Sequence, residues 1–301
     1  MRPSLQFQRR ALIVGAGASA LAVGYARAAH WHPEEAFPFR DLERHTGGRL
    51  GVHATYGGDG GPPDLVNRGG QRFPMCSSFK FILAACVLAR VDAGLEHLDT
   101  PVRIPPEALL SYAPVTSQAA KEGRPLTVQA LCEAAVKVSD NTAANLLLER
   151  VGGPVGLTRW MWKCDDTVTR LDRNEPSLNS AIPGDLRDTT TPFMMTGWLW
   201  RVQNTAVLHE PSRALLMAWM TDCTTGLTKL RAGAPKGWKV ADKTGFNGSD
   251  TTADVAILSP PSGPGFYIAA YVTQAKLRGV ELDAVFPEIT KIVLKTWGIH
   301  G

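Results

Sequence analysis

The segments that read as β-strands lie at the two ends of the chain, and those that read as helices lie between them. Residues 50–56 and 64–68 flank a Gly-rich break, a pattern typical of a β-hairpin. Strand patterns return at residues 238–243, 252–258 and 266–272. This order predicts an α+β fold: an antiparallel five-stranded sheet built from both ends and flanked by helices, with an all-helical lobe inserted.

The helical patterns fall mainly in the middle of the chain. Six helices are predicted, at residues 79–95, 128–136, 141–150, 192–202, 211–220 and 286–297. We place the sheet-containing lobe at about 35–73 and 223–301 and the helical lobe at about 74–222. The cleft between two such lobes is the expected location of a binding site.

The composition fits one large domain or two closely packed lobes. The chain has 301 residues, 44% of them hydrophobic, which is enough for a full core without disulfide bonds. Its formal net charge is +4, but the first 28 residues hold four arginines and no acidic residue. Without them 28 basic residues remain against 28 acidic ones, in no concentrated basic run, so we expect no nucleic-acid partner.

Residues 1–28 are predicted to be an export signal. Arg9 and Arg10 precede an uncharged, Ala- and Gly-rich run, and Ala26-Arg27-Ala28 offers small residues to a signal peptidase. The paired arginines predict twin-arginine export to the periplasm. A transmembrane anchor would need a longer apolar run, and a dinucleotide-binding fingerprint would need a second βαβ unit. The mature chain, residues 29–301, is therefore expected to have no membrane contact.

The cysteines do not predict a metal site. There are five, at positions 76, 86, 132, 164 and 223, so at least one is unpaired, and none are in CxxC spacing. Cys86 and Cys132 fall in apolar helical runs, where a role as small buried hydrophobic residues is favoured. We expect no metal ion and no cofactor.

Ser77 and Lys80 form a Ser-x-x-Lys pair at the start of the first predicted helix. On a helix, a lysine three residues after a serine lies one turn away on the same face, where its amine can take the serine proton. By itself the pair is weak evidence, because Ser-x-x-Lys arises by chance on the order of once in a chain of this length. Its significance depends on the motifs that follow.

Three further motifs follow in order. Ser139-Asp140-Asn141 lies between two predicted helices, and alone it reads as a helix-capping turn. Glu175 and Asn179 lie in what would otherwise be an exposed loop. Lys243-Thr244-Gly245 ends a predicted strand, where the lysine alone would be an ordinary surface residue.

In this order the four motifs resemble those of a class A serine β-lactamase over nearly the whole mature chain, and the leader resembles that of some chromosomal members. The resemblance implies that Ser77 attacks the lactam carbonyl and forms an acyl-enzyme, while Lys80 moves its proton. It implies that Ser139 passes a proton to the leaving nitrogen, beside the cation of Lys243. Glu175 would activate the water that hydrolyses the ester, and the base for acylation is disputed for the family.

The resemblance also implies a set of substrate-binding groups. The backbone amides of Ser77 and Phe246 would stabilise the oxyanion, and Asn141 would contact the amide of the substrate side chain. Arg173 and Asp188 match the family's ion pair across the neck of the loop that carries the catalytic carboxylate. The other expected binding residues are Tyr112, Asn179, Thr244, Gly245 and Lys229.

The sequence departs from the family at three positions. Phe246 stands where many members have a small residue, and it offers no hydroxyl to the substrate. Asn247 cannot form the disulfide that efficient carbapenem-hydrolysing members make with the residue matching Cys76, which predicts weak carbapenem hydrolysis. Thr252 replaces a carboxylate-binding arginine, and Lys229 is the proposed substitute, although lysine lacks the bidentate fork of arginine.

The sequence therefore predicts a periplasmic, monomeric hydrolase whose substrates are small β-lactams, namely penicillins and some cephalosporins. A penicillin-binding transpeptidase or carboxypeptidase shares the first half of this chemistry but lacks the Glu175 loop. A β-lactam sensor domain, which is acylated and does not turn over, should also lack a functional Glu175.

Overall fold

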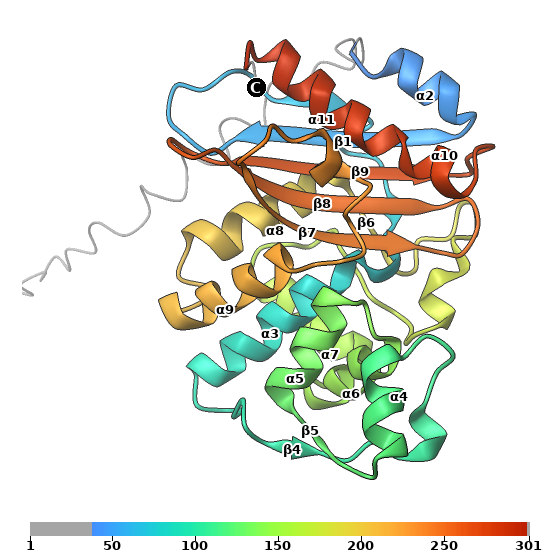
Figure 1. The fold of residues 1–301 in the computed structure, drawn as a ribbon, viewed down its shortest axis with the longest axis vertical. Helices are drawn as coiled ribbons and strands as arrows, with labels where there is room; N and C mark the ends of the chain where they lie inside the picture. Colours follow the sequence, from blue (N-terminus) through green and yellow to red (C-terminus); the bar gives the residue numbers. More distant parts are fainter. Residues whose placement is uncertain (1–37, 300–301) are drawn as a thin grey trace, which may run out of the picture. The chain divides into compact units, whose positions relative to one another are not determined.

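The computed structural model describes residues 38–299, which all belong to one compact unit of the chain. The signal peptide predicted over residues 1–28 lies outside the described residues. Within the described part, no helix is long and apolar enough to cross a bilayer. Figure 1 shows the α+β arrangement that the order of the sequence patterns predicts.

Five antiparallel strands form the main sheet, in the order β2-β1-β9-β8-β7. Their bounds are β1 Arg49–Tyr56, β2 Leu65–Asn67, β7 Lys239–Phe246, β8 Thr252–Ser259 and β9 Phe266–Thr273. Strand β1 pairs along its whole length with β9, from Arg49 opposite Thr273 to Tyr56 opposite Phe266. The two ends of the described chain are thus joined in one sheet, which confirms the predicted five-stranded architecture.

The α-helices lie on both sides of this sheet. Within residues 38–299 they are α2 Arg40–Thr46, α3 Lys80–Asp92, α4 Pro114–Lys121, α5 Val128–Lys137, α6 Asn141–Arg150, α7 Gly153–Lys163, α8 Pro192–Asn204, α9 Glu210–Thr221, α10 Gly279–Asp283 and α11 Val285–Thr296. Helix α3 is central, because its side chains from Lys80 to Leu88 are all buried and it contacts α5, α6, α7 and α9. Thr127 caps α5 by accepting a hydrogen bond from the backbone nitrogen of Ala130, as predicted.

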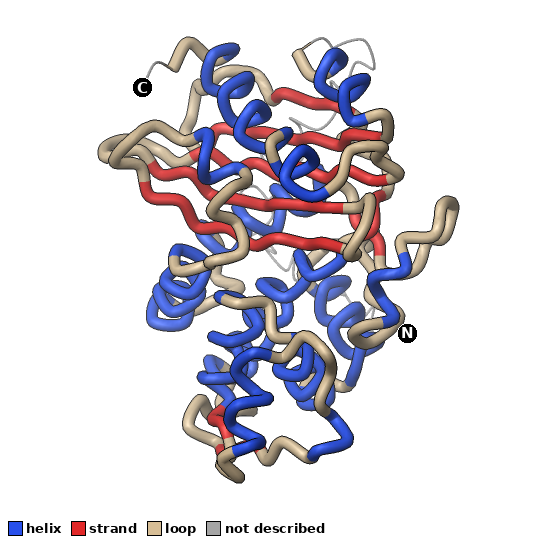
Figure 2. The backbone as a smooth tube through the Cα atoms, turned by 45° about the vertical axis from the view of Figure 1, so that its right-hand side comes forward, coloured by secondary structure: helices blue, strands red, loops and turns tan. Residues whose placement is uncertain are grey.

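Helices cover both faces of the sheet because its central strands are apolar on both sides. Along β8, Val255 and Ile257 belong to one apolar cluster, whereas Ala256 and Leu258 belong to another. Successive side chains of a strand point to opposite faces, so the two clusters lie on opposite sides of the sheet. One cluster contains side chains of α11, and the other contains those of α8 and α9. Figure 2 shows helices on both sides of the strand layer.

Several short elements were not predicted. Besides helices α2, α4, α7 and α10, they include two small ladders, β3 Phe73–Pro74 with β6 Thr189–Thr190 and β4 Pro101–Val102 with β5 Leu126–Thr127. Helix α7 contains Gly153 and Gly156, which have low helix propensity. It depends instead on the burial of Leu157 and Met161 in the apolar cluster that includes α3 and α6.

The predicted bounds of the two lobes remain a prediction. Helices α8 and α9 fall inside the predicted helical lobe, residues 74–222. In the structure α8 contacts strands β1, β8 and β9, and α9 contacts β7. These two helices therefore form a layer against the sheet, and helix α3 lies beyond them in contact with α9 (Figure 1).

Candidate active site

Ser77 lies in the tight turn that leads into helix α3. Residues Cys76–Phe79 form a 3-10 helix, and Cys76 has a left-handed backbone conformation with φ of 44°. Strand β7 lies directly against this turn, because a Cβ placed on Gly245 would be 2.5 Å from the backbone oxygen of Met75. Only glycine allows this approach, so the end of β7 and the turn that holds Ser77 form one edge of the site.

Glu175 connects the two residues of the Ser-x-x-Lys pair. The Ser77 hydroxyl donates a hydrogen bond to Glu175 Oε1 over 3.1 Å, and Lys80 Nζ lies 3.0 Å from the same oxygen. The backbone nitrogen of Lys80 donates to the backbone oxygen of Ser77, but among residues 38–299 no hydrogen bond joins the Ser77 hydroxyl to the Lys80 ammonium. The contact expected from their spacing is therefore made through the carboxylate. All three side chains are buried, which strengthens the electrostatic interactions between them.

Lys80 also holds the turn formed by Ser139, Asp140 and Asn141. Its ammonium donates to the backbone oxygen of Ser139 over 2.9 Å and to Asn141 Oδ1 over 2.6 Å. Asp140 caps helix α6, the role that the motif indicates by itself. Burial lowers the pKa of Lys80, and the carboxylate of Glu175 opposes this effect. The turn thus serves as a helix cap and as a wall of the site.

Lys243, on strand β7, is the second lysine in contact with Ser139. Its Nζ donates to Ser139 Oγ over 3.2 Å and to the backbone oxygen of Thr244 over 2.8 Å. Burial lowers the pKa of Lys243 to about 8, and the positive charge of Lys80 adds to this effect. An amine with this pKa is mostly protonated at neutral pH, so Lys243 supplies a cation beside Ser139.

The loop that carries Glu175 is fixed on both sides of the carboxylate. Asn179 Nδ2 donates to Glu175 Oε2 over 2.5 Å. Asn145, on α6, donates to the backbone oxygen of Glu175 over 2.9 Å and accepts from its backbone nitrogen over 3.0 Å. At the neck of the loop Arg173 Nε donates to Asp188 Oδ2 over 2.6 Å, which confirms the predicted ion pair. The peptide bond that follows Glu175 is cis.

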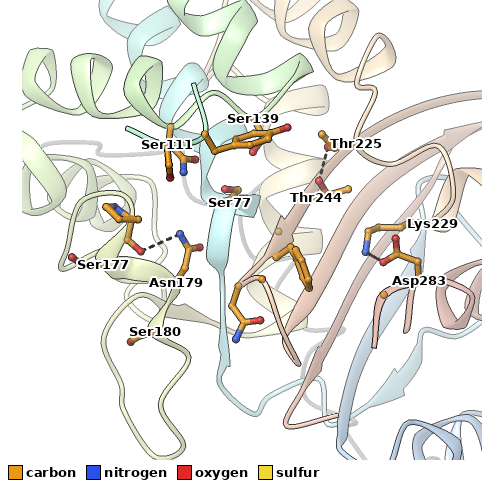
Figure 3. A pocket seen from close by; sticks show the side chains of 18 residues that line it. Ser77, Ser111, Ser139, Ser177, Asn179, Ser180, Thr225, Lys229, Thr244 and Asp283 are labelled. Atoms are coloured by element: carbon orange, nitrogen blue, oxygen red, sulfur yellow. Dashed lines mark hydrogen bonds and ion pairs between the residues drawn. The ribbon is translucent and has the colours of Figure 1, made fainter. Parts of the chain in front are cut away.

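These groups border a pocket of about 780 Å³ (Figure 3). The predicted site residues that line it are Ser77, Tyr112, Ser139, Asn141, Asn179, Lys229, Thr244, Gly245 and Phe246. Lys80, Glu175 and Lys243 are buried behind this lining, in contact with Ser77 or Ser139. The structure therefore brings all the predicted site residues together. The rings of Tyr112 and Phe246 are about half exposed, so both are available to a ligand.

Asn247 holds a tight turn at the edge of the pocket. Its Oδ1 accepts hydrogen bonds from the backbone nitrogens of Ser249, Asp250 and Thr251 over 2.9, 3.1 and 3.0 Å. Cys76 has a free, buried thiol whose pKa is raised by burial. The turn between β7 and β8 is thus held by side-chain capping, and not by a disulfide bond.

Lys229 lines the pocket, but its charge is already paired. Its Nζ lies 2.5 Å from Asp283 Oδ1 and donates to Thr252 Oγ1 over 2.5 Å. Thr252 is the residue that replaces the family's carboxylate-binding arginine. Sequence reasoning missed Asp283, and no local signal distinguishes it from the other acidic residues.

Two other residues of the site were also missed. Thr225 lines the pocket, and its Oγ1 lies 2.6 Å from Thr244 Oγ1. Asn145 brackets the backbone of Glu175 and lies four residues after Asn141 on helix α6. Helical periodicity places these two asparagines on one face, so Asn145 could have been found by extending the motif by one turn.

The arrangement is suited to acyl transfer. The buried hydroxyl of Ser77 donates to the carboxylate of Glu175, which in turn contacts Lys80. A base in this position can take the proton of the hydroxyl and so activate it as a nucleophile. A second lysine and several hydroxyls are placed to bind an anionic ligand. The open side of the pocket gives a small molecule access to the hydroxyl.

Comparisons with known proteins agree with this chemistry. A sequence model of the Beta-lactamase enzyme family matches residues 38–297. The chain is 41% identical to the carbapenem-hydrolyzing β-lactamase KPC of Klebsiella oxytoca, over 88% of this chain and 89% of that protein. It is 42% identical to β-lactamase L2 of Stenotrophomonas maltophilia, over 84% of this chain and 83% of that protein.

Solved structures are similar in fold as well. An ancestral class A β-lactamase is 44% identical with a TM-score of 0.84, and the match covers 87% of this chain and 100% of that one. A β-lactamase from Xanthomonas campestris pv. campestris is 43% identical with a TM-score of 0.82, and the match covers 85% and 94% of the two chains.

Proposed function

The chain belongs to the class A β-lactamase family, and we propose that it hydrolyses penicillins and some cephalosporins through an acyl-enzyme on Ser77. The observation that carries this proposal is the position of Glu175 Oε1, 3.1 Å from Ser77 Oγ and 3.0 Å from Lys80 Nζ. One carboxylate thus contacts both the nucleophile and the lysine, and we propose that it also activates the water that attacks the acyl carbon. A reaction with an acylation half and a deacylation half requires such a group.

In the acylation half, Ser77 Oγ attacks the lactam carbonyl as its proton leaves. Glu175 contacts this hydroxyl directly, and burial lowers the pKa of Lys80, so its ammonium loses a proton more readily than that of a free lysine and its amine can then accept the serine proton. Glu175 and Lys80 are therefore both placed to accept the proton of Ser77. They are also the two residues between which the base for acylation is disputed in the family. Ser139 contacts both lysines of the site and is placed to protonate the leaving nitrogen.

The oxyanion formed in this step needs two N–H donors. We assign them to the backbone amides of Ser77 and Phe246. The close approach of Gly245 to the Met75 oxygen supports this assignment, because it brings the end of β7 against the turn that holds Ser77. Phe246 follows Gly245 directly, so its amide lies at the same edge.

In the deacylation half, a water must be deprotonated and directed at the ester. Glu175 is the proposed base, and Asn179 holds the second carboxylate oxygen over 2.5 Å. Asn145 fixes the backbone of Glu175 from helix α6, so the carboxylate is aimed by a rigid element.

The rest of the pocket is proposed to orient the substrate. Lys243 and Thr244 would hold the substrate carboxylate, and Thr225 would orient the Thr244 hydroxyl, which lies 2.6 Å from its own. Asn141 would contact the side-chain amide, and the half-exposed ring of Tyr112 would form an aromatic wall. Lys229 remains a proposed substrate-binding residue, at the end of the pocket where it pairs with Asp283.

Carbapenems are proposed to be poor substrates. The relative KPC is named as carbapenem-hydrolyzing, but this chain differs from efficient members of that type at Asn247. Cys76 is free here, and Asn247 instead caps the β7–β8 turn. The edge of the pocket beside Ser77 is therefore held by hydrogen bonds of Asn247. In members that hydrolyse carbapenems efficiently, the resemblance implies a disulfide bond at this edge.

Steady-state hydrolysis by the purified mature chain tests this function. We expect turnover of a penicillin and slower turnover of a third-generation cephalosporin, with kcat/KM for a carbapenem at least about tenfold below that for the penicillin. The absence of penicillin turnover would contradict the proposed function. A carbapenem hydrolysed as efficiently as the penicillin would contradict the role given to Asn247.

Export by the twin-arginine route is also proposed, from Arg9 and Arg10 and the uncharged run that follows them. Fractionation of cells that express the full chain should place the activity in the periplasm. Replacing both arginines by lysines should keep the activity in the cytoplasm, and unchanged export of that variant would refute this route.

A further inference from the structure

An ion pair closes one end of the pocket. Lys229 Nζ lies 2.5 Å from Asp283 Oδ1, and both residues line the cavity. Among the 18 residues that line it, these two are the only ones with a charged side chain. This pair is therefore the only part of the described lining that carries formal charge of its own, whereas the cation of Lys243 lies behind Ser139 and Thr244.

The two partners are not equally accessible from the pocket. The Lys229 side chain is 6% exposed, whereas that of Asp283 is 35% exposed. The ammonium is turned inward, because it donates to Thr252 Oγ1 and lies 4.5 Å from the centroid of the Phe286 ring. The charge that this end of the pocket presents to a ligand is thus the carboxylate of Asp283, where the sequence predicted a cation.

The pair lies away from the loop that carries the catalytic carboxylate. Figure 3 shows it on one side of Ser77, with Ser177 and Asn179 on the other side and Thr244 between Ser77 and the pair. In the proposed reaction the amide of the acyl side chain contacts Asn141, and the substrate carboxylate contacts Lys243 and Thr244. The ring fused to the lactam then continues toward Asp283.

We propose that Asp283 is a specificity-determining residue that favours β-lactams with a positive charge on a substituent of the ring fused to the lactam. A cephalosporin with a quaternary ammonium on its C3 methylene is such a substrate. The inference rests on the proposed function, because it uses the substrate orientation that this function requires. A partly exposed carboxylate in a cleft attracts a cation and repels a second anion. Lys229 moderates this preference, because its ammonium cancels part of the field of Asp283.

The test compares two cephalosporins with the same acyl side chain. One carries the quaternary ammonium on C3, and the other carries a neutral acetoxy group there. The measured quantity is the ratio of kcat/KM, cationic over neutral, at low ionic strength. Asp283→Asn should lower this ratio about two- to fivefold, the range of a partly screened charge pair. Lys229→Met should raise the ratio, because it removes the ammonium that compensates Asp283.

Glu281→Gln is the matched control. It removes the same charge from the same helix, α10, at an exposed residue that does not line the pocket, so the ratio should not change. An equal ratio in the wild type, Asp283→Asn and Lys229→Met would overturn the inference. So would a change in Glu281→Gln as large as that in Asp283→Asn.

The same preparations distinguish this inference from the proposed function. A penicillin with an uncharged side chain carries no cation toward Asp283, so its hydrolysis by the wild type tests the function alone. Penicillin turnover together with an unchanged cephalosporin ratio would overturn only the role of Asp283. Failure to hydrolyse any of the three lactams would overturn both proposals.

Discussion

Replacing Ser77 by alanine is expected to abolish penicillin hydrolysis and to leave the fold intact. The substitution removes the oxygen that forms the acyl bond, so kcat should fall by about five to six orders of magnitude, as when other serine hydrolases lose their nucleophile. The free energy of unfolding should change by only about 1 kcal/mol, because one hydrogen bond, to Glu175, is lost. Steady-state kinetics and thermal unfolding measure the two effects separately.

Ser78→Ala is the matched control for this substitution. Ser78 is the next residue, it is fully buried, and it does not line the pocket. Its hydroxyl donates to the backbone oxygen of Met75 over 2.8 Å and lies 3.0 Å from the Tyr271 hydroxyl. Ser78→Ala should lose about 1–2 kcal/mol of stability and keep hydrolysis. Turnover near the wild-type rate in Ser77→Ala would contradict the assignment of the nucleophile.

Most of the candidate site could be predicted because its chemistry is concentrated in short motifs. The turn at Ser139 is one example, since its residues cap a helix and contact Lys80 within three positions. The sheet was predictable for a similar reason, because the polarity pattern of each strand is local. The motifs did not show which of their side chains are in contact with one another. The spacing of Ser77 and Lys80 indicated a direct contact, whereas both meet Glu175, almost a hundred positions later.

The residues that were missed depend on tertiary structure alone. Asp283 reaches the pocket from a five-residue helix near the C-terminus, and only the fold brings it to Lys229. For this reason the sequence indicated a free cation at that end, and the structure shows a neutralised pair with its anion outward. Helix α7 was missed for a different reason, since the packing of Leu157 outweighs the low propensity of its glycines.

Replacing Glu175 by glutamine is expected to separate the two halves of the reaction. Gln is nearly the same size as Glu, so it can fill the same place beside Ser77 and Lys80, but it cannot deprotonate a water. Acylation can still use Lys80, whose pKa is lowered by burial, whereas the ester has no base left to hydrolyse it. A covalent penicilloyl adduct on Ser77 should therefore accumulate, with kcat at least about a hundredfold lower.

Intact-mass spectrometry of Glu175→Gln after mixing with penicillin measures this adduct. Mass spectrometry of the peptides from a proteolytic digest then shows whether the adduct is on Ser77. The matched control is Glu96→Gln, another buried glutamate that is ion-paired, here with Arg150 over 2.7 and 2.8 Å. That variant should lose stability but show no adduct, because Glu96 is not part of the pocket. If Glu175→Gln is never acylated, Glu175 and not Lys80 is the base that activates Ser77, which its direct hydrogen bond to that hydroxyl also allows. If the variant turns over at the wild-type rate, Glu175 has neither role, and the base must be sought elsewhere.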